Sequence, residues 1–589
     1  MHHPFPGPAP TAAAARPSRL RRRVAALVSA VLVAVGMGAA AAPQAFAAAG
    51  CTATYANQSE WSGGFVAAVT VTDSGTTALT AWTVTFTFGG DQKVTSNWNS
   101  SQVQSLEYVT ASNLAYNGAV AVGSSTSFGF QGTWSASDAA PTGIACTPSA
   151  TVTPAIVATT SAAPVMQGFT DTYGVALSQA PTANVTVAVA RSSGNSGLSV
   201  GSGASLTFTP TNWNTAQNVT VAADTASTGA GTFTASSTGY TATAVTLTEV
   251  AATPAPQLHV SGNEIENAAG SQVILHGVNR SGAEYACVQG WGFFDGPVDE
   301  ASIQAIKSWT HVTAVRVPLN EACWNAESYV ASAYSGANYQ AAVENYVKLL
   351  NANGIVAILD LHWTDGLYIG TSSGCSSAEA TCQKPMPDSA EAIPFWTSVA
   401  TAFKGNNAVI FDLFNEPYAS RATGSTTSGW QCWENGGTCV GIGYPVAGMQ
   451  SMVNAVRSTG AGNILMLGGE EYANDLSQWL TYEPTDPDGD LVASWHSYDG
   501  NTCNTQSCWT SQVAPVMAKV PVIVGEMGEG DCAGTYIDPL TTWLESENTG
   551  FLAWTWDAWG SCSNVLISDY TGTPTGYGAA YKAILEALP

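Results

Sequence analysis

The strongest constraint on the fold is a series of eight short apolar segments, separated by longer amphipathic segments, within residues 258–589. Helical spacing is clear in residues 339–354, which end at Gly354 as helices commonly do. Eight strands alternating with helices over about 330 residues are typical of a closed (β/α)8 barrel. A doubly wound open sheet is the alternative, but no GxGxxG turn follows the first segment. The expected strands are residues 273–279, 314–319, 356–362, 409–417, 464–471, 491–498, 520–528 and 550–556.

Two all-β regions are expected before the barrel, because 589 residues are too many for one core. Residues 48–146 and 165–250 alternate apolar and polar side chains and break at Gly, Ser and Asp. We expect the second region to be an immunoglobulin-like spacer, since it contains neither His nor Cys. Thr-, Ala- and Pro-rich residues 147–164, which could also donate a strand, and residues 251–257 are the expected linkers. The predicted architecture is multidomain: a (β/α)8 TIM barrel preceded by two all-β sandwiches.

Residues 1–47 have the features of an export signal. Five arginines in residues 16–23 precede an apolar run at 24–42 and a small-x-small cleavage site at 45–47. A transmembrane anchor is the alternative; the many small residues and the cleavage site favour the signal. The paired arginines also fit a twin-arginine signal, so the export route stays open. We expect a secreted, extracellular protein.

Removal of the signal leaves 12 basic and 42 acidic side chains, a net charge of about −30. Such a surface repels nucleic acid and anionic membranes. No later stretch is apolar for the 18 residues that a membrane span needs. We therefore expect a monomer that acts on a neutral polymer and has no nucleic-acid or membrane partner.

All 12 cysteines follow the signal, as expected for disulfides formed in an oxidising compartment. A zinc site is the alternative, but CxxC pairs with nearby His are lacking. The expected pairs are Cys51/Cys146, Cys287/Cys323, Cys375/Cys382, Cys432/Cys439, Cys503/Cys508 and Cys532/Cys562.

Polar and aromatic residues stand at the carboxyl ends of several predicted barrel strands, where such barrels carry their active sites. Structural needs alone do not place so many there. The candidates are Arg316, His362, Asn415, Glu416, His496, Tyr498, Glu526 and Trp554.

Two of these candidates are carboxylic acids, Glu416 on the fourth strand and Glu526 on the seventh. Glycoside cleavage with retention needs two carboxyl groups roughly 5–5.5 Å apart, one a nucleophile and the other an acid and then a base. Two acids in one dry cleft do not both ionise easily, so one pKa rises and the roles separate. Glu470, Glu471 and Glu529 are rival carboxylates, and Glu470 or Glu471 is a candidate for a substrate contact beyond the cleavage point.

Asn415-Glu416-Pro417 on strand four and Gly525-Glu526 on strand seven resemble glycoside hydrolase family 5, over about residues 255–589. The resemblance implies that Glu416 is the acid/base and Glu526 the nucleophile. It also implies that Arg316 and Tyr498 hold the nucleophile ionised and oriented, and that Asn415 hydrogen-bonds the sugar 2-hydroxyl.

The same resemblance implies that His362 and His496 line the cleavage subsite. Trp554 is expected to stack beneath the sugar, with Trp556 as the alternative because the register of strand eight is open. Either histidine could instead ligate a metal, but no His/Asp cluster accompanies them, so we expect no metal and no cofactor.

Residues 51–146 resemble a family 2 carbohydrate-binding module, through the terminal cysteines and stretches such as EWSGGF and FGFQGTW. The resemblance implies that Trp61, Trp98 and Tyr116 form a flat strip on cellulose, although the third position is usually Trp. The family's xylan-binding branch has Arg where this chain has Gly64. A glycine there lets the Trp61 ring lie flat, which favours cellulose over twisted xylan.

Together these features predict a secreted retaining endo-β-1,4-glucanase, a cellulase targeted to cellulose by its binding module. A β-1,4-mannanase, or another plant-wall β-glycanase on the same barrel, is the alternative within enzymes. The alternative from another class is a polysaccharide-binding protein without catalytic activity.

Overall fold

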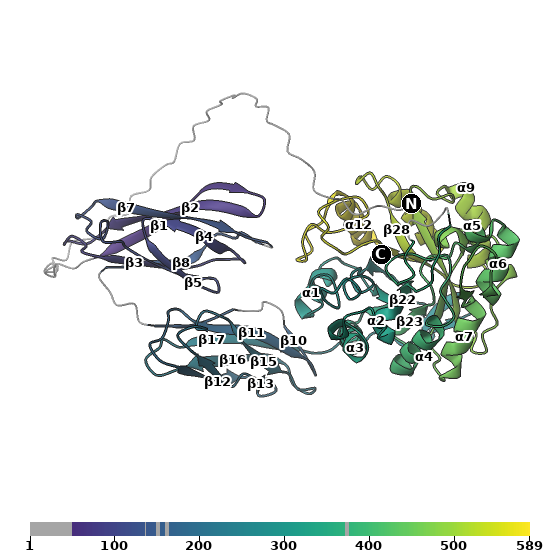
Figure 1. The fold of residues 1–589 in the computed structure, drawn as a ribbon, viewed down its shortest axis with the longest axis horizontal. Coiled ribbons are helices and arrows are strands. Elements are labelled where there is room, and N and C mark those ends of the chain that lie inside the picture. Colours follow the sequence, from purple (N-terminus) through teal and green to yellow (C-terminus); the bar gives the residue numbers. More distant parts are fainter. Residues whose placement is uncertain (1–49, 136, 149–153, 160–163, 371–375) are drawn as a thin grey trace, which may run out of the picture.

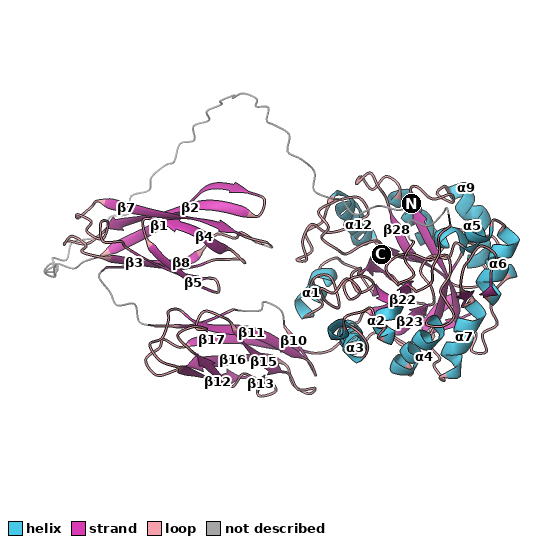
Figure 2. Cartoon of the chain, in the orientation of Figure 1, coloured by secondary structure: helices cyan, strands magenta, loops and turns pink. Residues whose placement is uncertain are grey.

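The computed structural model describes residues 50–135, 137–148, 154–159, 164–370 and 376–589, so the predicted signal lies outside the described residues. Figure 1 shows three bodies along the chain, two β-sandwiches and a larger barrel ringed by helices. All described helices belong to the barrel domain (Figure 2). The predicted multidomain architecture is confirmed. Within the described residues, no helix has both the length and the apolar character to cross a bilayer.

The first sandwich packs a sheet of order β1-β2-β7-β4 against one of order β5-β6-β3-β8. Between the sheets Trp82 stacks on Phe128 with ring centroids 5.4 Å apart. A disulfide joins Cys51 to Cys146 and so ties β1 to β8. The strands are β1 Cys51–Trp61, β2 Gly64–Asp73, β3 Trp82–Thr87, β4 Lys93–Trp98, β5 Ser101–Ser105, β6 Tyr108–Ser112, β7 Ser125–Thr133 and β8 Thr142–Pro148.

The second sandwich faces a sheet of order β10-β17-β16-β12-β14 with one of order β13-β15-β11-β9. Strand β9 pairs with β11, so part of the predicted linker 147–164 belongs to this domain, which begins before residue 165. The strands are β9 Ile156–Ala158, β10 Val165–Met166, β11 Thr170–Leu177, β12 Val185–Gly194, β13 Ser199–Ser202, β14 Ser205–Phe208, β15 Gln217–Ala222, β16 Gly229–Ser236 and β17 Thr243–Val250.

The third domain is a closed barrel of eight parallel strands, as predicted. Two strands are much shorter than the apolar segments that predicted them, because those segments continue into loops at the carboxyl end: β23 stops at Asp412 and β29 at Ala553. The barrel strands are β20 His276–Asn279, β21 Ala314–Asn320, β22 Val356–Trp363, β23 Val409–Asp412, β26 Leu465–Gly468, β27 Leu491–Tyr498, β28 Val522–Gly528 and β29 Gly550–Ala553.

Helices surround the barrel, and the longer ones bury one face. In α3, Val343, Tyr346, Val347 and Leu350 form that face, and Gly354, with φ of +82°, follows the helix end. The helices are α1 Glu300–Lys307, α2 Glu321–Asn325, α3 Ala337–Ala352, α4 Ala392–Phe403, α5 Ala419–Thr423, α6 Thr426–Asn435, α7 Met449–Ser458, α8 Glu470–Ala473, α9 Gln506–Cys508, α10 Ala514–Met517, α11 Ile537–Ser546 and α12 Gly576–Ala587. Short hairpins add β18 Leu258–Ser261, β19 Glu264–Asn267, β24 Gly437–Thr438 and β25 Pro445–Val446.

The barrel interior changes from apolar to polar along its axis. A buried cluster that includes Ile358, Ile410, Met466 and Ile523 fills the lower part. Towards the carboxyl ends of the strands the buried side chains become charged, beginning with Arg316, which lies beside Ile358 in the strand register. The polar site at the carboxyl ends of the strands therefore rests on this apolar cluster.

The predicted linker at 251–257 lies against the barrel for part of its length. The amides of Thr253 and Ala255 donate to the carbonyls of Ala352 and Asn351 at the end of α3, at 2.7 and 2.8 Å. These bonds fix its second half to the domain that follows.

Five of the six predicted disulfides are present in the described residues, which confirms those pairings; the sixth involves Cys375, which lies outside the described residues. The observed pairs are Cys51–Cys146, Cys287–Cys323, Cys432–Cys439, Cys503–Cys508 and Cys532–Cys562.

Candidate active site

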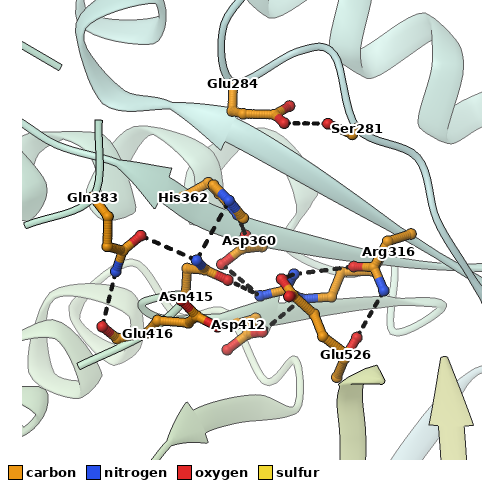
Figure 3. A network of polar contacts seen from close by, with 12 residues as sticks. Ser281, Glu284, Arg316, Asp360, His362, Gln383, Asp412, Asn415, Glu416 and Glu526 are labelled. Atoms are coloured by element: carbon orange, nitrogen blue, oxygen red, sulfur yellow. Dashed lines mark hydrogen bonds and ion pairs between the residues drawn. The ribbon is translucent and has the colours of Figure 1, made fainter. Parts of the chain in front are cut away.

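The eight predicted barrel residues meet in one network at the carboxyl ends of the strands, part of which is drawn in Figure 3. Strands β21, β22, β27 and β28 carry some of them, and the loops after β23 and β29 carry the others. The members are Arg316, His362, Asn415, Glu416, His496, Tyr498, Glu526 and Trp554.

Glu416 and Glu526 face each other across this network. Their closest oxygens and a nitrogen of His496 all lie within 4.8 Å of one another. Glu526 is almost fully buried, whereas 22% of the Glu416 side chain is exposed. A carboxyl pair at this separation can act on one sugar carbon as nucleophile and proton donor.

Both oxygens of Glu526 accept a strong hydrogen bond. Arg316 Nη1 donates to Oε1 at 2.7 Å, and the Tyr498 hydroxyl donates to Oε2 at 2.6 Å. Burial, followed by the charge of Glu526, raises the pKa of Tyr498 well above its ordinary value, so the phenol stays a donor. Two donors hold the carboxylate in one orientation.

Arg316 is the centre of the buried charges. Besides Glu526 it reaches Asp360 at 3.0 Å and Asp412 at 2.9 Å, and it donates to Asn279 and Asn415. Burial lowers the pKa of Arg316, but the three carboxylates raise it by more, so the guanidinium stays charged. One cation thus compensates several acids that would otherwise be costly to bury.

Asp360, Asp412 and Asn279 take part in the site although the sequence analysis assigned them no role. Asp360 and Asp412 are neighbours in the register of β22 and β23, and both are fully buried. Burial raises the pKa of Asp412 well above its ordinary value, against the opposing effect of Arg316. The available signal was an acid inside an otherwise apolar strand, which calls for a buried partner.

His362 connects the charge network to the aromatic side of the cleft. Its Nδ1 lies 2.6 Å from Asp360 Oδ2, and its ring stacks on Trp554 with centroids 5.5 Å apart. Burial lowers the pKa of His362, but Asp360 raises it by more. Trp556 is buried against Trp309, so of the two alternatives Trp554 is the one beside the site.

Glu416 has the environment of a proton donor. Burial raises its pKa, and His362 opposes that effect. His496 Nδ1 lies 3.1 Å from Glu416 Oε1 and 3.7 Å from Glu526 Oε2. Burial lowers the pKa of His496 to about 4, so the imidazole between the two acids is neutral near pH 7.

Gln383 is a further residue that the sequence analysis missed. It donates to the backbone carbonyl of Glu416 at 2.8 Å and accepts from Asn415 Nδ2 at 3.1 Å. The loop between β22 and α4 thereby fixes both residues at the end of strand four. A lone Gln in a long loop carries no sequence signal for such a role.

The rival carboxylates lie elsewhere. Glu529 accepts backbone bonds from Tyr536 and Ile537 at the start of α11, a structural position. Glu470 is fully buried and accepts from the Ser420 amide at 2.9 Å. Glu471 pairs with Arg421 and lines a pocket next to Glu416.

The two facing glutamates and His496 are also the place where a cation would fit. In the part of the chain that the structure describes, Glu416, His496 and Glu526 are the one group of three acidic, His or Cys side chains close enough to share an ion. Each of them also belongs to the hydrogen-bond network above, which explains their proximity without an ion.

The predicted cellulose-binding aromatics are exposed on the first sandwich: Trp61 by 46%, Trp98 by 44% and Tyr116 by 71%. A Cβ at Gly64 would lie 2.5 Å from the Trp61 ring, and one at Gly129 would lie 2.3 Å from the Trp98 ring. Each indole therefore rests flat on a glycine of the neighbouring strand. Such flat exposed rings can stack on a sugar face.

The Tyr116 hydroxyl donates to Asn99 Oδ1 at 2.9 Å, which joins its loop to the strand that carries Trp98. Trp82, by contrast, is buried in the core.

A (β/α)8 barrel with two facing glutamates, preceded by a sandwich with exposed aromatics, defines the class of modular glycoside hydrolases. Residues 267–560 match the family model for cellulase, glycosyl hydrolase family 5, and residues 51–150 match the model for the cellulose binding domain. Residues 267–560 therefore form a glycosyl hydrolase family 5 domain, and residues 51–150 form a cellulose binding domain.

Curated relatives match only part of the chain. Exoglucanase A of Cellulomonas fimi is 43% identical over 129 residues, 21% of this chain and 14% of that protein. Endoglucanase CelA of Streptomyces lividans is 38% identical over 122 residues, 20% and 26% of the two chains. Chitinase C of the same species is 40% identical over 114 residues, 19% and 18%. The chain thus spans about a quarter or less of each of these relatives.

Solved structures of similar fold include a β-glucanase of Saccharophagus degradans, 18% identical, covering 57% of this chain and 94% of that one with a TM-score of 0.44. A triple mutant of an endo-β-1,4-glucanase from Xanthomonas axonopodis pv. citri is 19% identical, covering 54% and 100% of the chains with a TM-score of 0.39.

Proposed function

We propose that this protein is a secreted endo-β-1,4-glucanase that cleaves β-1,4-glucan with net retention and binds cellulose through its first sandwich. The observation that carries the proposal is the pair Glu416 and Glu526, whose oxygens lie within 4.8 Å of each other at the active end of the barrel. Retaining glycosidases use carboxyl groups roughly 5 Å apart, whereas inverting enzymes leave room for a water between them.

In the first step, an oxygen of Glu526 bonds to the anomeric carbon while the glycosidic C–O bond breaks. Glu416 gives its proton to the departing oxygen, so the leaving chain departs as an alcohol. In the second step, the Glu416 carboxylate takes a proton from water, and the water oxygen displaces Glu526 from the same carbon. The two inversions return the original configuration.

The surrounding side chains support these roles. Arg316 and Tyr498 each donate a hydrogen bond to the nucleophile and hold it in one orientation. The Asn415 amide, held by Arg316 and Gln383, is 3.4 Å from His362 Nε2, and a sugar 2-hydroxyl can replace that long contact. Trp554 offers a flat face beneath the ring.

The binding module supports cellulose as the target. Two indoles lying on glycines, together with Tyr116, present flat apolar faces, each worth on the order of 1 kcal/mol when stacked on a sugar. Because Gly64 has no side chain, the Trp61 ring can lie parallel to the sheet. Secretion and the endo mode belong to the same proposal, supported by the disulfides and by the family membership.

The test combines stereochemistry with two variants. Proton NMR of the first products from cellohexaose should show the β-anomer before mutarotation. Glu526→Ala should lower kcat by at least about 10⁴-fold, as for loss of other nucleophiles, and should leave cellulose pull-down intact. First-formed α-anomer, or unchanged activity of this variant, would contradict the mechanism. Preferential cleavage of mannohexaose would replace glucan by mannan as the substrate.

A further inference from the structure

A pocket of about 280 Å³ opens next to Glu416. Its walls come from the loops after β23, β26 and β27, and Gln383 contributes as well. This volume lies near the lower end of the range of about 300–1,000 Å³ for small-molecule sites. Of the two facing glutamates only Glu416 lines the pocket. The lining residues are Gln383, Glu416, Arg421, Glu471, Tyr472, Gly500, Asn501 and Thr502.

One wall is built on an unusual backbone. Glu471, Tyr472 and Ala473 have φ of 56°, 62° and 57°, so three consecutive residues other than Gly adopt the left-handed conformation. Each such residue costs about 1–3 kcal/mol, and conformations of this kind concentrate at ligand clamps and active sites. They persist only where the surrounding structure holds them.

The active site itself holds this turn. The Tyr472 amide donates to the carbonyl of Pro417, the residue after Glu416, at 2.8 Å. Asn474 Nδ2 donates to the carbonyl of His496, also at 2.8 Å. The turn is therefore fixed to the two elements that carry the acid and the imidazole beside it.

The side chains on this wall form a stack, with the Tyr472 ring in the middle. The Tyr472 ring stacks on Tyr418 with centroids 4.7 Å apart, and the Arg421 guanidinium lies 5.1 Å over the Tyr472 ring. Arg421 Nε pairs with Glu471 Oε2 at 2.5 Å. The side chains of Arg421 and Glu471 remain 43% and 28% exposed.

This chemistry suits a neutral sugar. The paired charges cancel, so a charged ligand gains little, yet the pair still offers N–H donors and carboxylate acceptors. Sugar hydroxyls both donate and accept, so they can bond to both members of the pair. Charge-assisted hydrogen bonds to such hydroxyls are stronger than neutral ones.

We propose that Arg421, Glu471 and Tyr472 form the binding site for the sugar on the leaving-group side of the cleaved bond. The inference rests on the proposed function, in which Glu416 protonates the departing oxygen. The departing sugar must then lie on the Glu416 side, where this pocket is, whereas Trp554 and His362 lie outside its lining. Binding there positions the leaving oxygen against the acid.

The experiment compares two donors that share the same glycone. Cellotetraose places sugars on both sides of the cleaved bond, whereas β-cellobiosyl fluoride has only a fluoride ion on the leaving side. Arg421→Ala and Tyr472→Ala should each lower kcat/KM for cellotetraose by roughly 10- to 100-fold, the effect of losing one or two strong contacts. Both should keep kcat/KM for the fluoride within about twofold of the original chain.

Lys582→Ala is the matched control, because it removes one cation from an exposed ion pair on α12. It should change neither substrate's kcat/KM. Equal losses on both donors, or full activity of both variants on cellotetraose, would overturn the inference. Failure of the original chain to cleave both donors would instead overturn the proposed function.

Discussion

At the scale of single residues, the site depends on how buried charges are compensated. Arg316 is fully buried and contacts Asp360, Asp412 and Glu526 within 3.0 Å. Removing one partner of a buried charge group leaves the others unpaired in a low dielectric. The same guanidinium therefore serves both stability and the orientation of Glu526.

Arg316→Met should destabilise the barrel by about 3–5 kcal/mol at pH 7, because three acids lose their cation. The corresponding fall in Tm is roughly 10 °C. Burial already raises the pKa of Asp412, and Arg316 opposes that effect, so the deficit of the variant should shrink as pH falls and Asp412 binds a proton. Thermal melts at pH 5 and pH 7 measure this; an equal deficit at both pH values would contradict the account.

Glu416 should control the alkaline side of the pH profile. Burial raises its pKa, and only the protonated acid, present below that pKa, can assist departure of an alcohol. Profiles of kcat/KM should therefore fall at high pH for cellotetraose. The fall should be absent for β-cellobiosyl fluoride, whose leaving group needs no proton, and an identical alkaline limb for both donors would argue against Glu416 as the acid.

Some residues of the site could be identified from the sequence, and others could not. Glu416 and Glu526 stand at strand ends next to Asn415 and Gly525, a pattern visible in the chain itself. Asp360 was hidden inside an apolar strand, and its importance depends on the register that brings it beside Asp412. Gln383 lies in a long loop, whose path no local pattern determines.

At the scale of elements, the binding surface depends on glycines under aromatic rings. Trp98 is on β4, and its indole covers Gly129 of the neighbouring strand β7. The arrangement at Gly64 was predictable from the sequence, whereas the one at Gly129 was not, because it depends on the pairing of β4 with the distant strand β7.

Gly129→Ala should lift the Trp98 ring, because the added Cβ would lie 2.3 Å from it. Adsorption to cellulose should weaken about fivefold, the value of one lost stacking contact of about 1 kcal/mol. Val122→Ala, at another exposed position of the same module, is the control. Binding isotherms on microcrystalline cellulose measure both; unchanged adsorption of the glycine variant would show that the Trp98 ring contributes nothing.

The number and type of the barrel strands could be predicted from the sequence, but the residues at which they end could not. Eight apolar segments gave eight strands, yet β23 ends five residues before the predicted end at 417. The remaining apolar residues of that segment, such as Phe414, are buried in the loop above the barrel, so hydrophobicity alone does not separate strand from buried loop.

At the scale of the whole molecule, the chain separates attachment from cleavage. The exposed aromatics belong to the first sandwich, and the glutamate pair belongs to the barrel more than 300 residues later. A formal net charge of −25 opposes binding of the molecule to a polyanion. Domain order was readable from composition. Residues 147–164 do donate a strand, β9, which was one of the two expectations for them, but the boundary at 165 excluded it because Thr, Ala and Pro also suit a linker.

Cellulose adsorption by the full chain should be nearly independent of salt, because stacking on a neutral polymer involves no ion pairs. Changing NaCl from 50 to 500 mM should alter the binding constant by less than about twofold, unlike electrostatic association, which is screened. Depletion assays over this range measure it, and a steep loss of binding with salt would indicate charge-driven attachment.

The central claim is that Glu526 forms a bond to the sugar while Glu416 moves the proton. The most direct measurement is trapping with a 2-deoxy-2-fluoro-β-cellobioside that carries a good leaving group, followed by mass spectrometry of the digested protein. The account predicts one added fluorocellobiosyl group on the peptide containing Glu526. A group attached to any other residue, or turnover of the trap without a covalent species, would contradict it.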